Sequence, residues 1–173
     1  MRELMLGGAR SGKSAFAERR ARDSGLAVTY IATAETHDDS EMYARIAAHQ
    51  ARRPAHWALV EAPQRLADAI YQCASPDRVL LVDCLTLWLT NLLLADDKTF
   101  QHERARFLDT LQAAPGRIML VSNEVGQGVV PMDALSRRFV DEAGALHQTL
   151  AAQCERVWWV VAGLPQCLKG QGQ

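Results

Sequence analysis

A glycine-rich segment near the amino terminus has the residue types and the spacing of a phosphate-binding loop. It runs from Gly7 to Ser14 as GGARSGKS and matches the pattern G-x-x-x-x-G-K-[ST]. Glycines let the backbone curl so that its N–H groups face phosphate oxygens, and the amino end of the next helix adds a favourable field. Lys13 supplies charge to the β- and γ-phosphates and the Ser14 hydroxyl can ligate Mg²⁺, so the segment predicts nucleoside triphosphate binding. The expected phosphate contacts are Gly7, Gly8, Ala9, Arg10, Ser11, Gly12, Lys13 and Ser14.

A carboxylate, Asp83, follows the apolar run Val79–Val82. Open α/β sheets bind their ligands at the carboxyl ends of strands. An acid at such a strand end can hold the water shell of Mg²⁺ beside Ser14, as phosphate-loop enzymes require. The alternative is that Asp83 caps the helix expected from Leu85. We expect the metal role, because the loop needs a metal partner.

One histidine, His49, lies among basic residues at helical spacing. It follows Arg45 by four residues and precedes Arg52 by three, so a helix would place it in a basic stripe. Nearby cations favour the neutral imidazole, which is the nucleophilic form. Met42 and Ile46 also lie at helical spacing from it, so this histidine could instead sit at the edge of a packed face. Spacing alone leaves both interpretations open. The other histidines, which no surrounding pattern singles out for chemistry, are His37, His56, His102 and His147.

A second glycine-containing segment, Asn123–Gly128, follows another apolar run and is expected at the same ligand edge. It is either a flexible loop that shapes an acceptor site or a turn after which Pro131 starts the next helix. Both interpretations stay open.

Apolar runs alternate along the chain with helix-period segments, which is typical of βαβ units in a parallel sheet. The expected strands are Glu3–Leu6, Ala27–Ala32, Trp57–Val60, Arg78–Asp83, Arg117–Ser122 and Arg156–Ala162. The expected helices are Lys13–Asp23, Asp39–Arg52, Pro63–Cys73, Leu85–Leu94, Phe100–Gln112 and Asp133–Ala152. Residues 96–98 and 114–116 are expected as turns, and 169–173 as a frayed tail. We therefore predict a single α/β domain over residues 1–173, with helices on both faces of the sheet.

Composition narrows the class of protein. The 173 residues are 49% hydrophobic and 23% charged, with a formal net charge of -1. This balance gives no basic footprint for nucleic acid or an anionic membrane. Four cysteines without CxxC spacing indicate free thiols rather than a zinc site. The most apolar stretch, Leu80–Ala95, is interrupted by polar residues and too short to span a bilayer, so we expect a cytoplasmic enzyme without membrane insertion.

Taken together, these motifs closely resemble the bifunctional adenosylcobinamide kinase / adenosylcobinamide-phosphate guanylyltransferase family of cobalamin biosynthesis. The resemblance covers nearly the whole chain in order. The combination of GGARSGKS with NEVGQGVVP is far more specific than a phosphate loop alone. The matching segments are GGARSGKS at 7–14, YIATA at 30–34, RIAAHQARRPAHW at 45–57, VDCLTLWLTNLL at 82–93, SNEVGQGVVP at 122–131 and VWWVVAGLP at 157–165.

The resemblance implies two reactions. A nucleoside triphosphate phosphorylates the aminopropanol hydroxyl of adenosylcobinamide, with ATP and GTP both candidate donors. GTP then donates GMP to an enzyme histidine, and the guanylyl group passes to adenosylcobinamide phosphate. The family motif places this histidine at His49, with Lys13 as the other catalytic residue and Mg²⁺ held by Ser14 and Asp83. Further nucleotide contacts implied by the family are Ala32, Thr33, Ala34, Gln50, Ala51, Arg52, Arg53, Glu61 and Asp83.

The resemblance also implies a RecA-like P-loop NTPase fold with one antiparallel edge strand, and a homotrimer. At two positions this chain differs from some members of the family. Some members have glutamate at the position of Asp83, and some have a second histidine where this chain has Ala48. Two other functions share the phosphate loop: a different small-molecule or nucleotide kinase, which would have no use for His49, and a RecA-like ATPase acting on nucleic acid. The near-neutral charge argues against the second.

Overall fold

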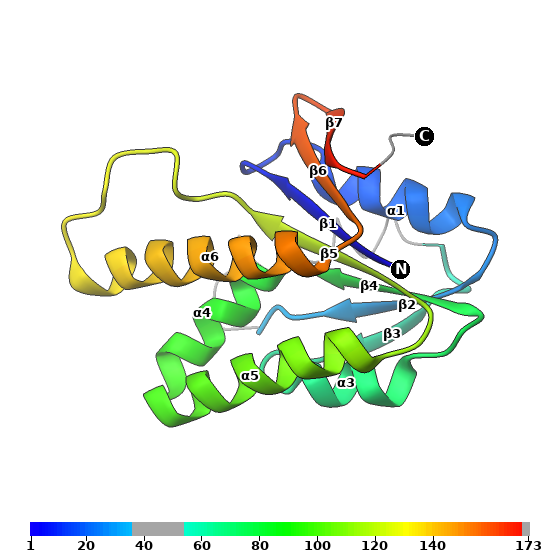
Figure 1. Ribbon diagram of the computed structural model, residues 1–173, viewed down its shortest axis with the longest axis horizontal. Coiled ribbons are helices and arrows are strands. Elements are labelled where there is room, and N and C mark those ends of the chain that lie inside the picture. Colours follow the sequence, from blue (N-terminus) through cyan, green and yellow to red (C-terminus); the bar gives the residue numbers. More distant parts are fainter. Residues whose placement is uncertain (36–53, 171–173) are drawn as a thin grey trace.

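The structure is a computed structural model that describes residues 1–35 and 54–170. Its described part is a seven-stranded sheet with helices on both faces (Figure 1). The strands are β1 (Arg2–Gly7), β2 (Ala27–Ala32), β3 (Ala58–Glu61), β4 (Arg78–Asp83), β5 (Arg117–Asn123), β6 (Arg156–Val161) and β7 (Leu164–Lys169). The helices are α1 (Lys13–Asp23), α3 (Leu66–Cys73), α4 (Leu85–Ala95), α5 (Asp97–Ala113) and α6 (Ala134–Gln153).

The strand order is β3-β2-β4-β5-β1-β6-β7. Neighbouring strands are parallel throughout, except that β7 runs antiparallel to β6. The predicted mostly parallel α/β sheet is therefore confirmed, together with the antiparallel edge strand. The expected helix at residues 39–52 lies outside the described residues.

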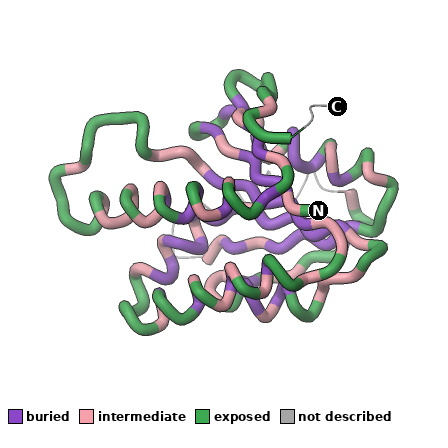
Figure 2. The backbone as a smooth tube through the Cα atoms, viewed as in Figure 1, coloured by how far each residue is buried: buried purple, intermediate pink, exposed green. Residues whose placement is uncertain are grey.

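The sheet separates two apolar cores, and Figure 2 shows the buried backbone concentrated in the central strands. Leu4 and Met5 are neighbours on β1 and belong to opposite cores, because side chains alternate along a strand. Phe16 of α1 packs in the core of Met5. The other core receives helices α3 to α6, where the rings of Trp88 and Phe107 lie 4.9 Å apart. Nearly continuous apolar strands are the consequence of this burial on both faces.

Two helix starts differ from the prediction: α3 begins at Leu66 rather than Pro63, and α5 begins at Asp97 rather than Phe100. The turn expected at 96–98 is wrong, since α5 begins there and the Asp96 side chain accepts a hydrogen bond from the Thr99 N–H at 2.9 Å. The start of α6 agrees with the expected range Asp133–Ala152, so the alternative in which Pro131 starts this helix is wrong. The Asp133 carboxylate caps the helix by accepting a hydrogen bond from the Ser136 N–H at 2.8 Å. Both caps satisfy helix N–H groups that would otherwise lack a partner.

The tail expected from Lys169 is wrong for that residue, which closes β7. Its ammonium donates to the carbonyls of Ala151 and Ala152 at 2.8 and 2.9 Å, at the end of α6. These contacts hold the edge strand against the helix.

The four cysteines carry free thiols, as predicted. Burial raises the pKa of Cys84, and it raises the pKa of Cys154 to about 12. Both thiols stay protonated at neutral pH and are poor nucleophiles. Among the described residues, no helix has both the length and the apolar character needed to cross a membrane.

Candidate nucleotide site

The phosphate loop connects β1 to α1. At two positions of this loop only glycine fits. Gly12 precedes α1 with φ of 92°, and a Cβ there would lie 2.9 Å from the Cα of Gly163. At Gly7 a Cβ would lie 2.4 Å from the carbonyl oxygen of Val160. Both contacts are closer than real Cβ atoms approach backbone, so the two glycines let the loop pack against the end of β6.

Neighbouring segments hold the loop from both sides. The Glu124 N–H, just after β5, donates to the Gly7 carbonyl at 3.0 Å. The Gly163 N–H, in the turn between β6 and β7, donates to the Ser11 carbonyl at 2.7 Å. The loop is therefore fixed by the two strands that flank β1 in the sheet.

The Lys13 side chain lies inside the loop. It is buried, and its ammonium donates to the Gly8 carbonyl at 3.1 Å. Burial lowers the pKa of Lys13, while the negative charge of Asp83 opposes that shift. A buried ammonium inside the loop is suited to bind the negatively charged oxygens of a phosphate.

Asp83 ends β4 at the same edge of the sheet, with β5 between it and β1. The hydroxyl of Tyr30 donates to its Oδ2 at 3.0 Å. Cys84 occupies the cap position of α4, so the alternative in which Asp83 caps this helix is wrong. The Asp83–Cys84 peptide bond is cis.

The oxygens at this edge fit a magnesium ion. The Ser14 hydroxyl is half-buried in the first turn of α1, and the Asp83 carboxylate lies at the end of β4. Both are the hard oxygen donors that Mg²⁺ prefers. In the described part of the chain, no three His, Cys, Asp or Glu side chains form a metal cluster. Mg²⁺ characteristically uses one or two protein oxygens with substrate phosphates, which is what these residues supply.

The end of β2 is tied to the start of α4 by Thr33. Its hydroxyl donates to the Cys84 carbonyl at 2.6 Å and accepts from the Cys84 N–H at 2.9 Å. The Thr33 side chain is fully buried, so it holds the strand edge in place rather than facing solvent. Its predicted neighbours Ala32 and Ala34 are half-buried beside it.

Asn91, on α4, was not singled out by the sequence. Its buried amide donates to the carbonyls of Thr33 and Pro63, both at 2.9 Å. It thereby joins the segments that follow β2 and β3. An asparagine among the leucines of this helix was the available signal, because a buried amide requires partners.

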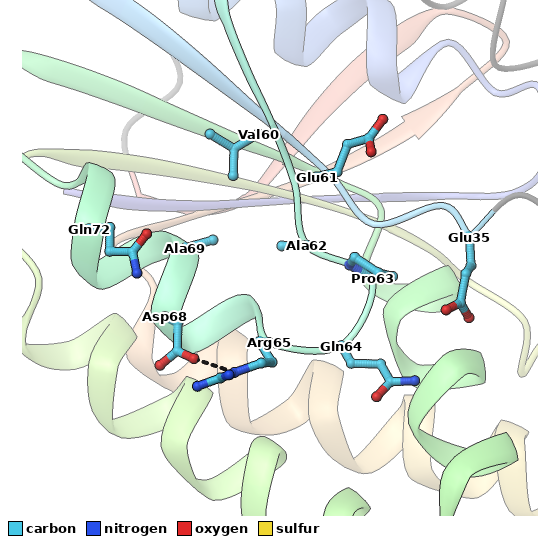
Figure 3. A pocket seen from close by; sticks show the side chains of 10 residues that line it. All are labelled: Glu35, Val60, Glu61, Ala62, Pro63, Gln64, Arg65, Asp68, Ala69 and Gln72. Carbon is cyan, nitrogen blue, oxygen red and sulfur yellow. Dashed lines mark ion pairs between the residues drawn. The ribbon is translucent and has the colours of Figure 1, made fainter.

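Glu61, the last residue of β3, lines a pocket of about 560 Å³ at the outer end of the strand edge. Figure 3 shows Glu35 and Gln64 on one side of this pocket. Toward α3 lies the ion pair between Asp68, on that helix, and Arg65, which directly precedes it. The pocket offers several hydrogen-bonding side chains next to a predicted nucleotide contact.

The remaining predicted residues fall into two groups. His49, Gln50, Ala51, Arg52 and Arg53 lie outside the described residues, as does His37. His56 and His102 are exposed, whereas His147 is buried with its Nε2 2.7 Å from the Ser122 hydroxyl oxygen. Burial lowers the pKa of His147, against the opposing charge of Glu124. This pair joins α6 to the end of β5, which the sequence did not indicate.

Solved structures with a similar fold include a recombinase and an ATPase of a secretion system. The RadB recombinase superposes with a TM-score of 0.53 at 16% identity, covering 91% of this chain and 73% of the other. The EscN ATPase of the enteropathogenic Escherichia coli type III secretion system has a TM-score of 0.54 at 12% identity, covering 93% and 43%. At these identities the likeness shows the P-loop NTPase fold alone.

Sequence relatives are much closer. The bifunctional adenosylcobalamin biosynthesis protein CobP of Pseudomonas aeruginosa is 62% identical over 172 residues, with 99% of each chain covered. The protein of the same description from Escherichia coli, CobU, is 41% identical, covering 93% of this chain and 96% of its own. Residues 3–168 match the family described as cobinamide kinase / cobinamide phosphate guanyltransferase. With the phosphate loop and Asp83 at one sheet edge, the chain belongs to the cobinamide kinase / cobinamide phosphate guanylyltransferase family.

Proposed function

We propose that this chain phosphorylates adenosylcobinamide with a nucleoside triphosphate and then converts the product to adenosylcobinamide-GDP with GTP. Membership of the family supports both reactions over a general kinase or a RecA-like ATPase. The observation that carries the proposal is the complete phosphate loop, with the buried Lys13 side chain inside it and Asp83 at the same ligand edge.

In the kinase reaction the aminopropanol hydroxyl attacks the γ-phosphorus of ATP or GTP. A new P–O bond forms, the bond to the β–γ bridging oxygen breaks, the hydroxyl proton passes to solvent water, and the nucleoside diphosphate leaves. Lys13 and the loop N–H groups stabilise the charge that develops on the phosphate oxygens. Mg²⁺, held by Ser14 and through water by Asp83, would neutralise the same charge.

In the guanylyl transfer a ring nitrogen of His49 attacks the α-phosphorus of GTP. A P–N bond forms and pyrophosphate leaves while the phosphate loop holds its oxygens. A phosphate oxygen of adenosylcobinamide phosphate then attacks the same phosphorus and releases the histidine. Imidazole suits this role because its ordinary pKa near 6.5 leaves it neutral above pH 7.

The nucleoside is proposed to lie along the edge formed by β4, β2 and β3. Ala32–Ala34 and Glu61 lie at this edge, where β2 and β3 end. Residues 50–53 complete the set of nucleotide contacts that the family motif implies. We also propose that the enzyme works as a cytoplasmic homotrimer, which light scattering of the purified protein tests.

The test of this function is covalent labelling at His49. Incubation with α-labelled GTP and Mg²⁺ should give a labelled peptide containing His49, with the acid-labile, base-stable bond of a phosphoramidate. His49→Ala should lose the label but keep GTP binding and part of the kinase activity, because the γ-phosphoryl group goes directly to the hydroxyl.

Two variants serve as controls. His56→Ala removes an exposed histidine and should label normally. Lys13→Ala should lose label together with GTP affinity, which separates binding from chemistry. Label on His56, or equal labelling of the His49→Ala protein, would overturn the assignment.

A further inference from the structure

Glu124, the residue that follows β5, lies between the phosphate loop and Asp83. In the sheet, β5 separates β1, which leads into the phosphate loop, from β4, which ends at Asp83 (Figure 1). Asp83 pairs with Val121, so β5 continues past the end of β4 before it reaches Glu124. The Glu124 N–H donates to the Gly7 carbonyl at 3.0 Å. The fold therefore places this glutamate beside the phosphates that the loop is expected to bind.

The Glu124 carboxylate is half-buried and is held at one oxygen. Its Oε1 accepts a hydrogen bond from the Gly126 N–H. A Cβ at position 126 would lie only 3.0 Å from that oxygen, so glycine leaves room for the carboxylate. Among residues 1–35 and 54–170, no group donates a hydrogen bond to the second oxygen. The backbone thus orients one oxygen, and the other remains able to accept a proton.

The residues on both sides of this glutamate are fixed by contacts with helices. Ser122 is bonded to His147 on α6, as described above. The Asn123 amide donates to the Thr86 hydroxyl at 2.9 Å, in the first turn of α4. Val125 packs against the core that receives α4 and α6. A carboxylate on a backbone held in this way is positioned before a substrate binds, which favours proton transfer.

The two proposed reactions differ in their need for such a base. In the kinase reaction the attacking group is a hydroxyl, which must lose its proton as the new P–O bond forms. In the guanylyl transfer the imidazole attacks with a lone pair. The second acceptor is a phosphate oxygen, which is already ionised at neutral pH because the second pKa of a phosphate monoester is about 6. A base for the acceptor is therefore required in the kinase reaction alone.

We propose that Glu124 is the general base of the kinase reaction. This inference rests on the proposed function, since that function supplies the hydroxyl. The Glu124 carboxylate accepts the hydroxyl proton while the oxygen bonds to the γ-phosphorus and the nucleoside diphosphate leaves. The protonated carboxyl group then gives the proton to solvent water. Asp83 stays with the metal, so the two carboxylates at this edge have separate tasks.

The variant Glu124→Gln tests this role. It removes the proton acceptor, while its amide oxygen can still accept from the Gly126 N–H. Transfer of γ-label from ATP or GTP to adenosylcobinamide, followed in a single turnover, measures the kinase reaction. Labelling of His49 by α-labelled GTP, and passage of that label to added adenosylcobinamide phosphate, measure the guanylyl transfer. The kinase rate should fall about 100-fold or more, and both guanylyl measurements should stay within about twofold of wild type.

The matched control is Glu142→Gln, which removes a half-buried carboxylate from α6 and should change neither reaction. Guanylyl transfer by Glu124→Gln also shows that this variant is folded and binds GTP. An unchanged kinase rate in Glu124→Gln would overturn the proposal, and so would an equal loss of both reactions, which would make the residue structural. Wild-type protein that transfers no γ-label to adenosylcobinamide would instead contradict the proposed function itself.

Discussion

Lys13 and Asp83 form the electrostatic centre of the ligand edge. The ammonium is buried, which lowers its pKa, and the carboxylate charge partly restores it. A bound triphosphate would add negative charge beside the ammonium and raise its pKa further. The Tyr30 hydroxyl holds one oxygen of Asp83 at 3.0 Å and thereby orients the carboxylate.

Replacing Asp83 should act through the metal. Asp83→Asn keeps the side-chain volume but removes the charge that holds the Mg²⁺ water shell, so we expect turnover to fall about 10- to 100-fold. The Mg²⁺ concentration for half-maximal rate should rise. A Mg²⁺ titration of steady-state rates measures both effects.

Tyr30→Phe is the matched control, because it removes the hydrogen bond to Asp83 and leaves the charge. Its effect on the Mg²⁺ titration should be smaller than that of Asp83→Asn. An Asp83→Asn enzyme with the wild-type titration and rate would remove Asp83 from the metal site.

At the scale of elements, α4 acts as a frame for two strand ends. Asn91 donates to the carbonyls of Thr33 and Pro63, and the Trp88 indole N–H donates to the carbonyl of Gln64 at 2.8 Å. The helix therefore sets the spacing of the segments after β2 and β3. These segments contain or directly follow the predicted nucleotide contacts Ala32–Ala34 and Glu61.

Asn91→Leu should loosen this frame. The change leaves the buried carbonyl of Thr33 and the part-buried carbonyl of Pro63 without this donor, so we expect the free energy of unfolding to fall by about 2–4 kcal/mol. The KM for GTP should rise more than kcat falls, because the strand ends shift while the phosphate loop is unaltered. Urea unfolding and steady-state kinetics give the two values.

Thr90→Ala is the control on the same helix, since the Thr90 hydroxyl bonds to the Thr86 carbonyl within α4. It should change neither property appreciably. Loss of stability in Asn91→Leu with an unchanged KM for GTP would limit Asn91 to a structural role.

At the scale of the whole molecule, the amino ends and the carboxyl ends of the parallel strands have different roles. The amino edge is closed by Glu3, which is fully buried and accepts from Arg20 Nε and Arg117 Nε at 2.9 Å and from the Trp158 indole at 3.2 Å. Burial opposes ionisation of Glu3, but the two arginines outweigh it and lower its pKa. The cluster joins α1, β1, β5 and β6 at the end away from the ligand.

Glu3 should make stability depend on acid pH. Its folded pKa lies below the unfolded value of about 4.3, so its contribution is present above that pH and is lost as the pH falls through the folded pKa. At neutral pH, Glu3→Gln should lower the free energy of unfolding by about 3 kcal/mol, because two arginines lose their carboxylate. Urea unfolding of both proteins from pH 7 to pH 2 should show the difference shrinking on acidification. A constant difference across this range would contradict the ion-pair explanation.

The sequence by itself determined the features whose causes are local. The phosphate loop is set by glycine and lysine at fixed spacing, and Gly12 takes the left-handed conformation that spacing implies. The strands could also be predicted from the sequence, because a parallel strand that is buried on both faces is a continuous apolar run. Asp83 was located in the same way, by its position after such a run. The start of α5 was predicted less well, because Asp96 resembles a turn residue until its capping hydrogen bond is seen.

Tertiary structure alone decided which residues support the site. Asn91 meets the Thr33 carbonyl from 58 positions away, and Ser122 meets His147 across 25. No pattern of spacing along one element reports such contacts, because each partner is chosen by how helices pack on the sheet. Strand order places β5 and β6 beside β1 although they are far from it in the chain, so the backbone groups of Glu124 and Gly163 that fix the phosphate loop come from distant segments.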